Sequence, residues 1–346
     1  MAKKIVSLAV AVALLRAMGI VAQQTPSAGM PASRTVHLNV QAETKSGEPV
    51  GGLTQRDFKL LDNGAPPNVT SFKEVSAGQE QVEVIVLIDA VNANFDTASY
   101  VRDQVQKFLG SNGGKLAQST TIAVLTDKGV QAAKSFSTDG NALLAELNQN
   151  TSGLREINRT AGFWGATERL QICLNAVREI GQFGAGLPGR KIVLWISPGW
   201  PLLSGPRMDL DANQERQIFG DVVSLSTQLR EANVTINNIN PLGAGENLMR
   251  ADYYEQFTKG VDKPSQVNIA DLSLQVLAVQ SGGLALEGST DVEGLLVRCL
   301  KDVRTWYEIT FPAGVPEKPN EYHHVEVKVD KPGVTARTRD GYYAQP

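Results

Sequence analysis

The stretch of sequence that decides the fold is Val82-Glu83-Val84-Ile85-Val86-Leu87-Ile88-Asp89. Its residues are aliphatic except for the second and the last. A strand with one solvent-exposed face would alternate apolar and polar residues. This run therefore predicts a strand buried on both faces of a parallel sheet. Downstream, Val101, Val105 and Phe108 recur at helical spacing. The strand and the helix together predict one α/β unit.

The same alternation continues toward the C-terminus. Further buried strands are predicted at residues 121–125, 191–197, 234–239 and 283–286, and apolar helix faces at 143–147, 170–180, 218–229, 272–279 and 292–303. Strands that alternate with helices are typical of a parallel sheet covered on both faces. The sequence therefore predicts an α/β domain with a doubly wound, mostly parallel sheet over residues 80–304.

Both flanks of this domain have a different periodicity. Val36, Leu38 and Val40 alternate with polar residues, and Val325 and Val327 do the same near the C-terminus. This is the period of half-buried strands, and each set is too small to be stable alone. Residues 34–79 and 305–346 are therefore predicted to pair into one small β-sandwich, with the α/β domain inserted between its two parts.

The first 33 residues look like an export segment and a linker. Lys3 and Lys4 precede an apolar run from Ile5 to Leu15, which is too short to span a bilayer. Residues 1–22 are predicted to be a signal peptide, and the polar residues 23–33 a linker. The alternative is an N-terminal helix that stays on the protein. We expect an exported chain, in the periplasm, at the cell surface or secreted, with no membrane span after cleavage.

Charge and cysteine content exclude several classes of protein. The net charge is −3 and no basic run occurs, so no nucleic-acid partner is expected. Export would permit a disulfide between Cys173 and Cys299. Both cysteines lie in helical apolar patterns, however, and two separate buried thiols are the favoured interpretation.

The motifs of the common nucleotide-binding and hydrolytic sites are missing. No Gly-x-Gly-x-x-Gly follows the first buried strand, and neither a Gly-Lys-Ser/Thr nor a Gly-x-Ser-x-Gly sequence occurs. His37, His323 and His324 all lie in the terminal β segments. A Ser-His-Asp triad or a histidine metal site inside the α/β domain is therefore excluded, and no enzymatic activity is expected.

Polar residues follow the predicted buried strands. In a doubly wound sheet the ligand crevice lies beyond the carboxyl ends of the strands, where the strand order reverses. The residues placed at this edge are Asp89, Asn92, Thr126, Asp127, Ser197 and Trp200.

Four motifs together resemble the acidobacterial VWFA-related proteins, which carry a von Willebrand factor A domain. They are Asp89-Ala-Val-Asn92, the run from Gly189 to Ser197, Ser281-Gly282-Gly283, and Arg339-Asp-Gly-Tyr-Tyr343. The resemblance covers nearly all of the mature chain. It implies a secreted or surface binding protein without an established catalytic activity.

The family's metal-ion-dependent adhesion site is degenerate in this sequence. The family motif is Asp-x-Ser-x-Ser, but Val91 and Ala93 occupy the serine positions, and Ser197-Pro-Gly stands where a late Asp is expected. The remaining vestigial positions are Asp89, Asn92, Thr167 and Ser197. Because Mg²⁺ needs about six oxygen ligands, no metal and no other cofactor is expected. A rebuilt Mg²⁺ site is the alternative; without metal, Asp89 would cap the next helix or bond neighbouring backbone amides.

Aromatic residues near the same edge could serve as anchors for a partner. The candidates are Trp164, Trp200, Tyr253 and Tyr254. Interface hot spots are enriched in Trp and Tyr, although these rings could equally pack the loops onto the sheet. The predicted function is non-enzymatic binding of an unidentified protein or envelope component. Alternatives are metal-dependent adhesion, a purely structural envelope role, or a hydrolase that uses Asp89 with Asp127.

Overall fold

The computed structural model describes residues 35–133, 135–149, 162–201, 210–243 and 253–345, with the side chains of 162–164 left out. The chain divides into two units, residues 1–33 and residues 34–346. The predicted signal peptide and linker therefore lie outside the described residues. Among the described residues, no helix has both the length and the apolar character needed to cross a membrane.

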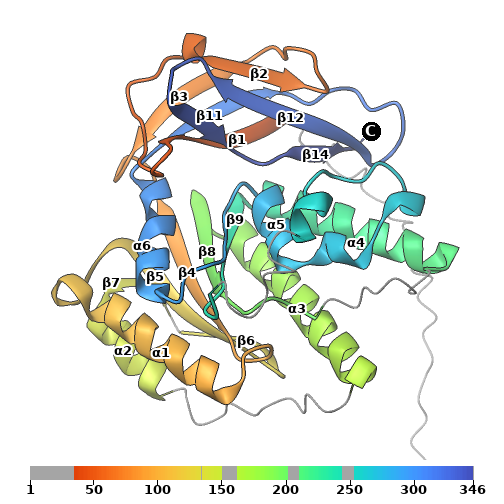
Figure 1. Cartoon of the computed structure of the whole chain (residues 1–346). Coiled ribbons are helices and arrows are strands. Elements are labelled where there is room, and N and C mark those ends of the chain that lie inside the picture. Colours follow the sequence, from red (N-terminus) through yellow and green to blue (C-terminus); the bar gives the residue numbers. More distant parts are fainter. Residues whose placement is uncertain (1–34, 134, 150–161, 202–209, 244–252, 346) are drawn as a thin grey trace, which may run out of the picture. The chain divides into compact units, whose positions relative to one another are not determined.

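A largely parallel sheet forms the centre of the unit, in the strand order β10-β9-β8-β4-β5-β6 (Figure 1). Only β6 and β7 pair antiparallel, both with β5. The strands are β4 (Val82–Asp89), β5 (Lys115–Thr126), β6 (Gly129–Ala132), β7 (Ser137–Asp139), β8 (Arg190–Ile196), β9 (Val234–Ile239) and β10 (Ala285–Leu286). The chain goes from β4 to β5 on one side and then crosses to β8 on the other. The order of the strands therefore reverses between β4 and β8.

Helices cover both faces of this sheet. They are α1 (Phe95–Gly110), α2 (Gly140–Gln149), α3 (Gly162–Ala185), α4 (Ala212–Glu231), α5 (Leu274–Gln280) and α6 (Val292–Cys299). Val84, Val86 and Ile88 pack in one apolar cluster with α1, α2 and α6. Ile85 and Leu87 pack in a second cluster with α3, α4 and α5. Successive side chains of β4 thus enter opposite cores, which is why its apolar run is nearly continuous.

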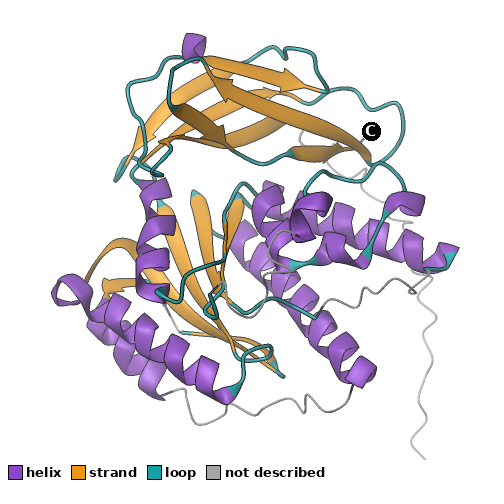
Figure 2. Ribbon diagram, in the orientation of Figure 1, coloured by secondary structure: helices purple, strands orange, loops and turns teal. Residues whose placement is uncertain are grey.

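Two antiparallel sheets contain the strands from both flanks of the chain. Their orders are β13-β1-β11-β3 and β14-β12-β2. The strands are β1 (Thr35–Thr44), β2 (Phe58–Asp62), β3 (Ser71–Ser76), β11 (Thr305–Pro312), β12 (Glu321–Val329), β13 (Val334–Arg337) and β14 (Gly341–Ala344). β1 pairs with β11 and β2 pairs with β12, so strands from the two flanks of the chain lie side by side. One apolar cluster draws residues from both sheets. Figure 2 shows that these sheets are joined almost entirely by loops, whereas the long helices belong to the central sheet.

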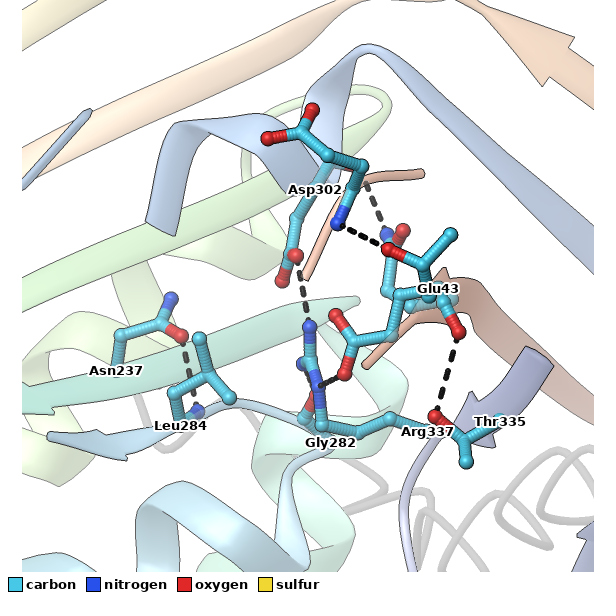
Figure 3. Close-up of polar contacts among 10 residues, drawn as sticks. Glu43, Asn237, Gly282, Leu284, Asp302, Thr335 and Arg337 are labelled. Atoms are coloured by element: carbon cyan, nitrogen blue, oxygen red, sulfur yellow. Dashed lines mark hydrogen bonds and ion pairs between the residues drawn. The ribbon is translucent and has the colours of Figure 1, made fainter. Parts of the chain in front are cut away.

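A buried polar cluster joins the antiparallel sheets to the central sheet (Figure 3). Arg337, the last residue of β13, donates from Nη2 to Asp302 Oδ1 at 2.7 Å and from Nη1 to the Gly282 carbonyl at 2.7 Å. Gln41 of β1 donates to the Asp302 carbonyl at 2.7 Å. Arg190, which begins β8, donates to the same carbonyl at 3.2 Å. These contacts lie at the amino ends of the parallel strands, so the carboxyl ends are at the opposite edge of the sheet.

Candidate functional site

The site lies where the order of the parallel strands reverses. Asp89 is the last residue of β4, and Ser197 directly follows β8. The two strands are parallel neighbours, with Ile88 opposite Ile196. Ser197 Oγ donates to Asp89 Oδ2 at 2.7 Å. These two residues therefore come together at the point where the strand order reverses.

Within the described part of the chain, four hydrogen bonds of ordinary length reach the carboxylate of Asp89. Oδ1 accepts from the backbone N–H groups of Val91 at 3.0 Å and of Asn92 at 2.9 Å. Oδ2 accepts from the side-chain amide of Asn92 at 2.9 Å, in addition to Ser197. The side chain is 0% exposed. A carboxylate has about four lone-pair positions, so the protein itself occupies all of them.

One of the two roles predicted for a metal-free Asp89 is correct and the other is wrong. Asp89 does bond the neighbouring backbone amides. The cap of α1 is instead Asn94, whose side chain accepts from Thr97 N at 2.7 Å. The β4–α1 connection is long enough to contain a second acceptor, and a helix N-terminus takes the acceptor that directly precedes it.

Burial and hydrogen bonding act in opposite directions on the charge of Asp89. Burial raises the pKa of Asp89, while the hydrogen bonds from Asn92 and Ser197 oppose that shift. Ser197 is held in its donating orientation because its Oγ also accepts from Gly199 N at 3.1 Å. The network therefore fixes the carboxylate in position within a dry environment.

Cys173 also belongs to this network, although the sequence did not point to it. Asn92 Nδ2 contacts Cys173 Sγ at 3.1 Å. Burial raises the pKa of the Cys173 thiol well above its usual range, and nearby Asp89 raises it further. Cys173 and Cys299 are both buried and free, which confirms the interpretation as two separate thiols. Cys173 was expected only on the buried face of a helix, and helical spacing alone cannot show which strand end that face meets.

The residues at this site do not fit a Mg²⁺ ion. Val91 and Ala93 offer no side-chain oxygen, and Asn92 directs its amide nitrogen toward Asp89. Thr167 lies half-buried in α3 and is not one of the four donors to Asp89. A near-octahedral set of oxygen ligands would require the carboxylate network to break.

The hydrolase alternative required Asp89 and Asp127 to face a common crevice. Asp89 is fully buried, whereas Asp127 lies exposed in the turn between β5 and β6. Thr126 helps to form that turn, since its hydroxyl donates to the Gly129 carbonyl at 3.2 Å. The two carboxylates therefore do not share one solvent-facing environment.

The predicted aromatic anchors lie in three different environments. Trp200 is 6% exposed and packs edge-on against Trp195, with ring centroids 5.3 Å apart, so the packing alternative describes it. Trp164 is in the first turn of α3, and its side chain lies outside the described part of the chain. Tyr253 and Tyr254 are half-buried in the short helix η5 (Tyr253–Phe257), and Tyr253 packs against Phe257.

The segment that follows η5 returns to the antiparallel sheets instead of lining the crevice. Gln280 of α5 donates to the Phe257 and Thr258 carbonyls, and Val261 N donates to the Tyr343 hydroxyl in β14. Residues 257–261 therefore lie toward the antiparallel sheets and not around the crevice. After β9 the chain must run back across the sheet to the edge where β10 begins. Helix α5 covers only about 10 Å of that path, at 1.5 Å per residue. The segment before α5 therefore has to cover the rest of the path.

An exposed aromatic residue beside the site was missed in the sequence. Phe95, the first residue of α1, is 70% exposed and follows the cap residue Asn94. It lies off the apolar face marked by Val101 and Val105. This mismatch is the signal in the sequence that could have identified it.

Comparisons with known proteins give weak similarity only. No protein-family model and no curated protein matches the sequence, so the resemblance to acidobacterial proteins receives no support from them. Three similar solved structures are a human COPII-coat protein (TM-score 0.36, 8% identity), the pilus adhesin SpaC from Lactobacillus rhamnosus GG (0.36, 10%) and the manganese-loaded TRAP protein from Plasmodium vivax (0.36, 10%). The matched regions cover 79%, 85% and 83% of this chain, and 46%, 49% and 100% of the three solved chains in the same order. The chain thus spans about half of the first two. At TM-scores below 0.5, these similarities assign neither a family nor a function.

Proposed function

We propose that the chain is an exported, non-enzymatic binding protein with a von Willebrand A-like domain. In this proposal it contacts a protein partner through the face at the carboxyl ends of the parallel strands, called the carboxyl-end face below. In this proposal the domain spans residues 80–304 and is inserted in a β-sandwich formed by 34–79 and 305–346. The reversal of strand order between β4 and β8 and the pairing of the two flanks support this organisation.

The observation that carries the proposal is the saturated carboxylate of Asp89. An adhesion site of the metal-dependent kind offers open oxygen ligands to an ion, and an acidic group of the partner completes the set. Here the Asp89 oxygens already accept four hydrogen bonds from Val91, Asn92 and Ser197. The site therefore serves to fix the β4–α1 connection, and affinity has to come from groups on the surface of that connection.

Phe95 is the best placed of these groups. Asn94, Phe95 and Asp96 are consecutive exposed residues at the start of α1. Burying a phenylalanine ring against a partner is worth about 1.5 to 3 kcal/mol, and polar neighbours form the kind of rim seen around such anchors. Trp164, in the first turn of α3, remains a proposed second anchor.

We expect Phe95→Ala to reduce partner capture without reducing stability. Loss of an anchor costs about 2 kcal/mol, or roughly thirtyfold in affinity. The melting temperature should stay close to that of the wild type, because the ring is mostly exposed. The measurement is quantitative pull-down from a native envelope extract with the mature chain as bait.

Phe183→Ala is the matched control. Phe183 is 50% exposed in the last turn of α3, near the edge where β8 begins, so it lies away from the proposed face. Its replacement should leave capture unchanged. Equal capture by both variants and the wild type would remove Phe95 from the interface and would favour a purely structural role for the protein.

A further inference from the structure

Two largely buried arginines lie on segments that come together where α4 contacts the antiparallel sheets. Arg230 lies in the last turn of α4, and Arg339 lies between β13 and β14. Asn39 of β1 brings their chain segments together. Its carbonyl accepts from Thr338 Oγ1 at 2.8 Å, and its side-chain amide donates to Asn233 Oδ1 at 2.6 Å.

Arg339 has no counterion within the described part of the chain. It is 5% exposed, and no acceptor or carboxylate there pairs with its guanidinium. Two neighbouring groups act on it: the charge of Arg230 lowers its pKa, and Tyr322 raises it. Burial, together with Arg230, lowers the pKa of Arg339 to about 9.

Only some of the hydrogen-bond donors of Arg230 have a partner among the described residues. Its side chain is 9% exposed, and Nη2 lies 3.2 Å from Oε1 of Glu231, a carboxylate that is itself 47% exposed. The buried Nε–H of Arg230 has no partner among the described residues. Arg230 therefore keeps a buried donor without a partner among the described residues, and it lies near enough for its charge to act on Arg339.

Two other cations, Arg337 and Lys191, have partners for their charges or donors. Arg337 pairs with Asp302 at 2.7 Å and approaches Glu43 at 3.5 Å. Lys191 donates to two backbone carbonyls, at 2.9 and 2.8 Å. Asp340, next to Arg339 in sequence, does not compensate it, because the charge acting on Asp340 is that of His324.

A buried cation without a partner is strongly unfavourable unless something neutralises it. Guanidinium groups present a planar fork of donors that matches the oxygens of a tetrahedral oxyanion. We propose that Arg230 and Arg339 together bind a small inorganic oxyanion, phosphate or sulfate, at this junction. The site is separate from the carboxyl-end face and does not depend on the function proposed for that face.

The test compares oxyanions with chloride at equal ionic strength. The melting temperature of the wild-type chain should rise with phosphate or sulfate concentration and then saturate, because a ligand that binds only the folded state stabilises it. Calorimetric titration with phosphate should show one site. Arg230→Met and Arg339→Met should each abolish both signals. Arg298→Met, which removes an exposed arginine from the last turn of α6, should keep them.

In chloride alone, Arg339→Met should melt no lower than the wild type, because the buried charge has been removed. The proposal is overturned if the wild type shows no saturable oxyanion-specific rise and no calorimetric binding. It is equally overturned if Arg298→Met loses the signal to the same extent as the two buried variants. The wild-type titration decides the question even if a variant fails to fold.

Discussion

Replacing Asp89 by Ala is expected to lower the free energy of unfolding by about 3 to 5 kcal/mol, the range seen when one partner of a buried charged network is removed. The substitution leaves four donors without an acceptor in a fully buried site: two backbone N–H groups, the Asn92 amide and the Ser197 hydroxyl. Each buried unsatisfied group costs about 1 to 3 kcal/mol unless water reaches it. Urea denaturation of the mature chain measures the loss.

Two further variants show whether the loss comes from the network. Asp89→Asn keeps an oxygen for the two backbone donors but presents an amide to Asn92 and Ser197, so we expect a smaller loss, about 1 to 3 kcal/mol. Asp96→Ala removes an exposed carboxylate from the first turn of α1. That change should cost at most about 1 kcal/mol. A loss for Asp89→Ala no larger than that for Asp96→Ala would mean that the network does not stabilise the fold.

The second large effect is expected at the polar cluster in Figure 3. Asp302 is 4% exposed and pairs with Arg337, and its charge also acts on buried Arg190. Asp302→Ala would remove the carboxylate that acts on both guanidinium groups and leave Arg337 only its longer contact with Glu43, at a cost of about 3 to 5 kcal/mol. Differential scanning calorimetry should show an earlier transition.

Glu48→Ala is the control for this substitution. Glu48 forms ion pairs with Lys301 and Arg304, but it is half-exposed. Exposed ion pairs contribute little to stability because solvent screens them, so the transition should barely move. Similar shifts for the two variants would show that Asp302 acts as a surface charge and does not hold the antiparallel sheets to the central sheet.

Much of the fold could be predicted because buried parallel strands have a strong local signal. The run from Val82 to Ile88 and the strand Val234–Ile239 lie where their apolar residues place them. The antiparallel strands β6 and β7 at the sheet edge were not predicted. Their residues are partly exposed and carry little apolar pattern. Only the turn at Asp127 to Gly129 marks them in the sequence.

The candidate site was predictable in position but not in detail. Asp89 and Ser197 meet because parallel strands end at one edge, which the strand order alone requires. The burial of Trp200 depends on the turn at Gly199, whose φ of 97° lets the chain fold back onto the sheet. The meeting of Arg230 with Arg339 depends on tertiary packing between segments more than 100 residues apart, and no local pattern encodes it.

Calorimetric titration of the mature chain with Mg²⁺ tests the central claim most directly, namely that the chain itself fills the Asp89 site. No heat of binding is expected at millimolar Mg²⁺, and EDTA should leave the melting temperature unchanged, because the carboxylate has no free position for an ion that holds its water strongly. Saturable binding, with a rise in melting temperature of several degrees that is lost in Asp89→Asn, would contradict the claim. It would show that Asn92 and Ser197 can release Asp89 to a metal ion.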